Sequence, residues 1–184
     1  GQYLGCFSVG VGRNAADAVN LRPDCFEDIV AAISLYRPGP MDSIPKYIEN
    51  KKDRSKIQYV TPLLAPILDA TYGCIVYQEQ VMEIFRRVAG YTFGHADLVR
   101  RAMAKKHADE LEAEREGFVS GAEKNGVSHE DAVALFESMA DFASYAFNKS
   151  HAAAYAVVSY RIAYLKLHYP REYMAALLTS VLGN

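Results

Sequence analysis

The sequence predicts a mainly α-helical domain of several short helices with little or no sheet. Apolar side chains recur every three or four residues along most of the chain, the spacing that places them on one face of a helix. Proline and glycine separate these stretches, and only residues 74–77 have an extended pattern, which is too short to establish a sheet. A chain of 184 residues is long enough for one domain with a substantial core.

The first half of the chain combines weakly periodic and clearly helical stretches. Residues 1–20 are glycine-rich and are set apart as an uncertain N-terminal segment, so the helical domain is expected over 21–184. Asp24 is placed to cap the first helix, which has to end before Arg37-Pro38-Gly39-Pro40 because two prolines and a glycine form a rigid turn there. Helices are predicted over 25–36, over 44–51, after Thr61-Pro62 and over 78–89.

The second half is predicted to be helical almost throughout. Gly90 and the pair Asn125-Gly126 are typical helix stops, and Ser128 with Asp131 resembles a capping arrangement. Ser150 is predicted to cap a long helix, and Pro170 to begin the last one. The expected helices cover 94–106, 108–124, the residues after Ser128, 151–168 and 170–182.

Composition and charge exclude several classes of protein. The apolar stretches are short and interrupted, so neither a membrane span nor a membrane partner is expected. Cys6, Cys25 and Cys74 are widely spaced and contain no Cys-x-x-Cys pair, which argues against a structural zinc site and favours a reducing, cytoplasmic location. The net charge of −2 hides a local basic cluster near residue 100.

That cluster contains Arg100, Arg101, Lys105 and Lys106 in one predicted helix. Like charges four residues apart repel each other by about 0.2–0.5 kcal/mol unless an anion lies between them, and Asp97 alone cannot neutralise four cations. A polyphosphate or a nucleic-acid backbone could bind there, with arginine suited to bidentate phosphate contacts. The competing interpretation is a solvated helix end whose cations favour the helix dipole.

A second candidate lies at a predicted helix start and comprises Asn148, Lys149, Ser150 and His151. Free backbone N–H groups at such a start attract anions, and Lys149 adds a full charge. Tyr155 follows His151 by one helical turn, so the two rings could stack on a base or a sugar. Ordinary capping, with the tyrosines in a core, is the alternative.

Two further groups are weaker candidates. Residues 77–80, Tyr-Gln-Glu-Gln, could read bases or line a cavity, although Glu79 also suits a first helical turn. Arg37 could contact phosphate or a DNA backbone, and a structural role in its turn is the alternative. No Asp-x-Asp occurs in the chain, so no catalytic residue and no metal ligand is assigned to it.

In order and spacing, a set of segments resembles the C family of bacterial replicative DNA polymerases, the alpha subunits of DNA polymerase III. The resemblance covers the chain from about Leu21 to its end. It rests on residues 21–30, 35–41, 71–73, 76–82, 96–103, 147–156 and 172–179, with Phe-Asn-Lys-Ser-His-Ala-Ala-Ala-Tyr-Ala at 147–156 the strongest match.

The resemblance implies a fingers-type module that positions the incoming dNTP and the DNA template-primer. Arg100 and Arg101 would lie near the triphosphate, 148–151 would face the same pocket from its other side, and His151 would sense the sugar. Lys105 and Lys106 would attract phosphate or the DNA backbone. Mg²⁺ would be held by the catalytic aspartates of a palm domain absent from this chain, so the chain alone is expected to be inactive. The partners would be that palm and the replicative holoenzyme subunits.

Two departures from the family pattern and two rival hypotheses accompany this interpretation. Residues 6–10 read Cys-Phe-Ser-Val-Gly where the family has Phe-Gln-Leu-Glu-Ser, and Ala104 replaces a usual glycine.

A non-catalytic helical module that binds nucleic acid or a protein is the main alternative. The salt dependence of its affinity would distinguish nucleic-acid binding from protein binding. Binding to phosphate weakens steeply as the salt concentration rises, whereas docking to a protein should not. A degenerate remnant that keeps only the fold is the other rival.

Overall fold

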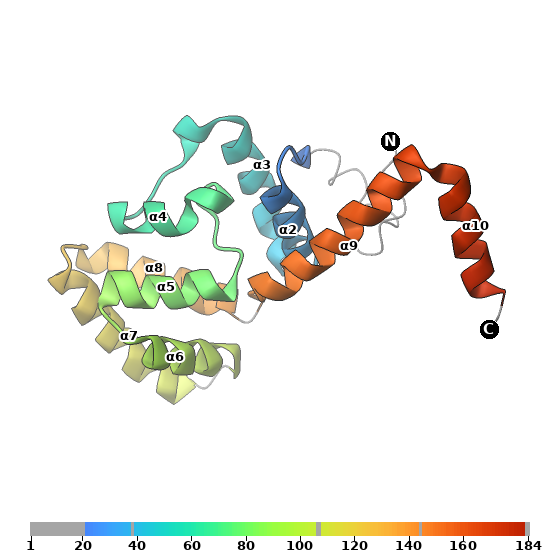
Figure 1. The fold of residues 1–184 in the computed structure, drawn as a ribbon. Coiled ribbons are helices and arrows are strands. Elements are labelled where there is room, and N and C mark those ends of the chain that lie inside the picture. The colour runs from blue at the N-terminus through green and yellow to red at the C-terminus, as the bar shows by residue number, and fades with distance from the viewer. Residues whose placement is uncertain (1–20, 38, 106–107, 144, 183–184) are drawn as a thin grey trace. The chain divides into compact units, whose positions relative to one another are not determined.

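The computed structural model describes residues 21–37, 39–105, 108–143 and 145–182, and it confirms the predicted helical class (Figure 1). Within these ranges the regular structure consists of nine α-helices, α2 to α10, and short 3₁₀ turns. The same residues contain no strand, and one parallel bridge joins Tyr77 to Phe147. The chain divides into two compact units, residues 1–36 with 150–184 and residues 37–149.

The larger unit, residues 37–149, is built around α5. In Figure 1 α5 lies between α4 and α6, and it packs against α6 and α7. Its core is aromatic: the Phe85 ring of α5 lies 5.0 Å from Phe118 and 6.2 Å from Phe136, measured between ring centroids. The helices are α3 (Ile44–Lys52), α4 (Ala65–Leu68), α5 (Gln78–Ala89), α6 (Phe93–Lys105), α7 (Ala108–Lys124) and α8 (His129–Ala143).

Local signals explain most helix ends of this unit. Gly90 follows α5 with φ of 76°, a left-handed conformation in which glycine has no Cβ penalty, and Gly126 follows α7 with φ of 84°. The backbone N–H of Asp131 donates to the Ser128 hydroxyl at 3.1 Å, which confirms the predicted cap of α8. The helix expected after Thr61-Pro62 is reduced to 3₁₀ turns on either side of the four-residue α4.

The smaller unit contains α2 (Phe26–Leu35), nearly all of α9 (Lys149–His168) and α10 (Pro170–Val181). The prediction that Asp24 caps α2 is wrong: Cys25 is the N-cap residue. The Asp28 carboxylate instead accepts N–H bonds from Asp24 at 3.1 Å and Cys25 at 3.4 Å, because a carboxylate one turn inside a helix can reach back to its start. No helix in the described part of the chain is both long enough and apolar enough to cross a bilayer.

Candidate functional site

The helices α5 and α9 begin side by side at the parallel bridge between Tyr77 and Phe147. The Gln78 N–H donates to the Phe147 carbonyl at 3.0 Å, and the Phe147 N–H donates to the Val76 carbonyl at 3.4 Å. The Gln78 side-chain amide donates to the Ala146 carbonyl at 3.0 Å. Backbone hydrogen bonds thus join two segments that lie about 70 residues apart in the sequence.

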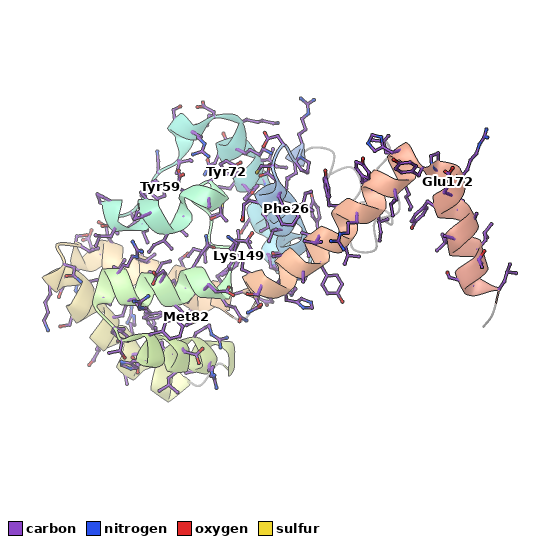
Figure 2. All side chains as sticks on the ribbon, viewed as in Figure 1. Phe26, Tyr59, Tyr72, Met82, Lys149 and Glu172 are labelled. Carbon is purple, nitrogen blue, oxygen red and sulfur yellow. The ribbon has the colours of Figure 1, made fainter. Side chains whose placement is uncertain are left out.

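Glu79, in the first turn of α5, extends this junction through its side chain. Its carboxylate accepts the Lys149 backbone N–H, with both oxygens 3.1 Å from the nitrogen, and the Asn148 side-chain amide at 3.1 Å. Figure 2 labels Lys149 where α9 begins, beside the amino end of α5. A carboxylate suits this place because the first N–H groups of a helix lack intrahelical acceptors and carry a partial positive charge.

This contact corrects the predicted start of α9. Ser150 was expected to cap a helix beginning at His151, whereas α9 begins at Lys149. The acceptor for the first N–H comes from α5 and not from a neighbouring residue of the sequence. The N–H of Lys149, part of the predicted anion site, therefore already holds a carboxylate.

The side chain of Lys149 lies against an aromatic face. Its Nζ is 5.3 Å from the centroid of the Tyr77 ring, within the range of a cation–π interaction. Tyr77 is buried and Lys149 is half-buried. The Tyr77 ring therefore restricts the position of the Lys149 ammonium group without neutralising its positive charge.

Arg100 and Arg101 in α6 share one carboxylate, that of Asp97. Arg100 donates to one oxygen through Nε at 3.1 Å and through a terminal nitrogen at 2.8 Å, and Arg101 reaches the other oxygen at 2.7 Å. The hydrogen bond from Arg100 is the main cause that lowers the pKa of Asp97. Among these three side chains, one negative charge thus lies between two positive charges.

The two arginines differ in exposure. The side chain of Arg100 is 17% exposed and that of Arg101 is 63% exposed. Ala96 and Val99, on the preceding turn, are fully buried and hold this face of α6 against the core. Arg101 is therefore the arginine of the pair that a ligand in solution can reach.

Arg37 has internal partners in the structure. Its guanidinium donates to the Tyr145 carbonyl at 2.7 Å and lies 4.1 Å from the centroid of the Phe147 ring. Partial burial lowers the pKa of this arginine. These contacts favour the structural role in the turn, and the predicted phosphate contact stays a prediction.

The remaining candidates are placed only in part. The His151 ring lies 4.6 Å from the Tyr155 ring between centroids, so the predicted one-turn spacing brings the two rings together. Ser150 follows Lys149 in the first turn of α9. The side chain of Lys105, the whole of Lys106 and the N-terminal segment 1–20 lie outside the residues that the structure describes. The predicted pocket shared by the arginine pair and residues 148–151 stays a prediction.

Sequence reasoning missed the roles of Glu79 and Gln80. Gln80 was expected to read bases or line a cavity, and Glu79 lies in the first turn of α5, as the alternative for it held, but the partners of both side chains were not foreseen. Gln80 is buried, and its carbonyl oxygen accepts the N–H groups of Val76 at 2.8 Å and Tyr77 at 3.0 Å. The closely spaced polar side chains were the available signal, but their partners lie in other segments.

The described carboxylates do not form a two-metal site. The only close group of potential ligands among the described residues is Asp24, Cys25 and Asp28, whose ligand atoms lie within 4.8 Å of one another. Asp28 already accepts two backbone N–H groups there. Asp97 and Glu79 are likewise engaged by cations and N–H groups, so these residues do not fit a magnesium centre for nucleotidyl transfer.

The fold and these side chains define an α-helical module with cationic and amide groups at the carboxyl-terminal part of α6 and at the start of α9. Residues 1–126 match the family described as the bacterial DNA polymerase III alpha subunit finger domain. The chain therefore belongs to this finger-domain family.

Curated relatives agree with this assignment over nearly the whole chain. A DNA polymerase III subunit alpha from Thermus aquaticus is 50% identical over 97% of this chain and 15% of the relative. The protein of the same name from Chlamydia muridarum is 50% identical over 97% of this chain and 14% of the relative. That from Escherichia coli is 48% identical over 89% of this chain and 15% of the relative. The chain thus spans only about one seventh of the length of these relatives.

Proposed function

We propose that this chain is the fingers segment of a DNA-directed DNA polymerase that acts in chromosomal replication. It positions the incoming deoxynucleoside triphosphate and the template-primer. The observation that carries the proposal is Arg101, an exposed guanidinium beside Arg100; among the side chains that the structure describes, both arginines pair with the one shared Asp97 carboxylate. A triphosphate supplies the missing negative charge, and a preorganised arginine stabilises charge on its phosphates without reorganisation. Membership of the finger-domain family supports this choice of ligand.

The other candidate residues have narrower roles in this proposal. Lys149 attracts phosphate with an ammonium group held over the Tyr77 ring, and Asn148 presents its amide beside it. His151, backed by the Tyr155 ring, contacts the sugar of the nucleotide. Lys105 and Lys106 add attraction for phosphate or the DNA backbone.

The chemical step belongs to residues outside this chain. Because the chain contains no Asp-x-Asp and the carboxylates of Asp28, Glu79 and Asp97 are engaged in capping and ion pairs, we assign Mg²⁺ and the catalytic carboxylates to a palm domain of a longer polypeptide. The partners are that palm, the template-primer, dNTP and the replicative holoenzyme subunits in the cytoplasm. The isolated chain binds substrate groups but does not catalyse nucleotidyl transfer.

The test is steady-state nucleotide incorporation by the full-length polymerase that carries this segment. Arg101→Ala removes a charged phosphate contact, so the KM for dNTP rises about tenfold or more. Arg87→Ala is the matched control, because Arg87 is a comparably exposed arginine, paired with Glu83 on α5, that has no proposed ligand. If both variants keep the wild-type KM for dNTP, the proposed function is wrong.

His151 has its own readout. His151→Ala lowers the preference for deoxynucleotides over ribonucleotides, because the proposed contact is to the sugar. Tyr160→Ala, a further exposed aromatic position on α9, serves as the control. An unchanged ratio of the two kcat/KM values in His151→Ala removes the sugar role.

A further inference from the structure

Glu79 connects the starts of two helices that the sequence separates by many residues. It is the second residue of α5, and its carboxylate binds the first N–H of α9 and the side-chain amide of Asn148. All three distances are 3.1 Å. The backbone bridge between Tyr77 and Phe147 lies directly beside this contact and holds the two segments in register.

The contact determines the geometry of the residues assigned to nucleotide binding. An asparagine amide is free to rotate about its side-chain torsions, and a hydrogen bond to a fixed carboxylate selects one orientation. A carboxylate on the first N–H of a helix also stabilises the helix at that residue. Glu79 thus has two effects: it orients Asn148 and it makes α9 begin at Lys149.

We propose that Glu79 is a positioning residue for the nucleotide site, an inference that rests on the proposed function. Asn148 and Lys149 are held in their binding arrangement before the nucleotide arrives, so binding does not have to order them. The Glu79 carboxylate also occupies the Lys149 N–H, so phosphate is met by the Lys149 ammonium group and not by that backbone N–H. Glu79 itself contacts neither the nucleotide nor the reacting atoms.

The experiment measures KM and kcat of the full-length polymerase for dNTP and, separately, for primed DNA. Glu79→Ala raises the KM for dNTP roughly fivefold to tenfold, because Asn148 and the start of α9 lose their orientation. The KM for primed DNA stays at the wild-type value. Glu79→Gln keeps one acceptor oxygen and gives an intermediate rise. Glu83→Ala is the matched control, because Glu83 lies one turn further along α5 and pairs with Arg86 and Arg87 of its own helix.

A purely structural role for Glu79 predicts a different pattern. Loss of folded protein lowers the active fraction, so kcat falls while both KM values stay unchanged. That pattern in Glu79→Ala overturns the inference, as does a KM for dNTP equal to that of Glu83→Ala.

A double-mutant cycle with Asn148→Ala separates this inference from the proposed function. Glu79 acts partly through Asn148, so the double variant has a smaller rise in the KM for dNTP than the product of the two single effects. If the rise in the KM for dNTP of the double variant equals the product of the two single rises, Glu79 does not act through Asn148, which contradicts the inference. If Asn148→Ala raises the KM and Glu79→Ala does not, only the role of Glu79 fails. If Arg101→Ala leaves the KM for dNTP unchanged, the proposed function fails and the role of Glu79 with it.

Discussion

The side-chain amide of Gln80 donates to the hydroxyl of Thr71 at 2.7 Å, and both side chains are buried. The same amide donates to the Ile67 carbonyl at 3.3 Å, while the Gln80 oxygen accepts two backbone N–H groups from residues 76 and 77. One side chain therefore joins the start of α5 to the turns around α4. Its hydrogen bonds stay inside the protein, so Gln80 is a structural residue and does not read a base.

Removing this side chain is expected to destabilise the protein. Gln80→Ala leaves buried donors and acceptors without partners, and we expect the free energy of unfolding to fall by about 2–3 kcal/mol. Urea denaturation followed by circular dichroism measures the change. Gln58→Ala removes an exposed amide and should stay within about 0.5 kcal/mol of wild type. Equal effects at the two positions would contradict the structural role of Gln80.

Gly121 allows α7 to approach α5 closely. A Cβ at this position would overlap the carbonyl group of Ala89 at the end of α5. Gly121→Ala should therefore lower the free energy of unfolding by about 1–3 kcal/mol, since backbone cannot move aside as a side chain can. Gly94→Ala in α6 is the control, because a Cβ there has no neighbour within 4 Å. We expect Gly94→Ala to be neutral or slightly stabilising.

The ion pairs of Asp97 make a pH-dependent contribution to stability. Its pKa in the folded protein lies below the ordinary value, so the contribution is present above the unfolded pKa of about 3.9 and is lost as the pH falls through the folded pKa. Asp97→Asn removes it. We expect wild type to be more stable than this variant at pH 7 by no more than about 1 kcal/mol, since Arg101 is largely exposed.

The difference between wild type and Asp97→Asn should shrink when unfolding is measured below about pH 4. Chemical denaturation at several pH values gives the measurement. A difference that is constant from neutral to acid pH would show that the charge of Asp97 contributes nothing to stability.

Cys74 is expected to react slowly with thiol reagents. Burial raises the pKa of this thiol to about 11. At pH 8 only about one molecule in a thousand then carries the reactive thiolate. A variant with Cys6→Ser and Cys25→Ser isolates Cys74, and its labelling by an aromatic disulfide should be at least about a hundredfold slower when folded than in denaturant.

The matching variant with Cys6→Ser and Cys74→Ser isolates Cys25, which is exposed. Cys25 should be labelled faster than Cys74 at pH 8, even though partial burial raises its pKa as well. Labelling of folded Cys74 at the rate of Cys25 would contradict the buried environment of its thiol.

The sequence by itself determined the fold class and most helix bounds. α5 and α7 have the predicted limits, 78–89 and 108–124. Each has an apolar stripe, and a glycine or an Asn-Gly pair follows it directly in the sequence, so the signals for both helices are local. The start of α10 at Pro170 and the cap of α8 by Ser128 are local in the same way. The motifs that resemble the polymerase family were also visible in the sequence.

Tertiary structure decided how the candidate residues are held. α9 begins at Lys149 because Glu79 supplies an acceptor from another helix, a contact between residues 70 positions apart. The packing of distant segments places the Arg37 guanidinium over the Phe147 ring. It also leaves the side chain of Arg101 exposed while that of Arg100 is largely buried. Helical periodicity and capping depend on neighbours within about one turn, whereas these partners depend on which distant segments pack together. The pattern of residues therefore predicted the helices, and packing decided which polar groups satisfy one another.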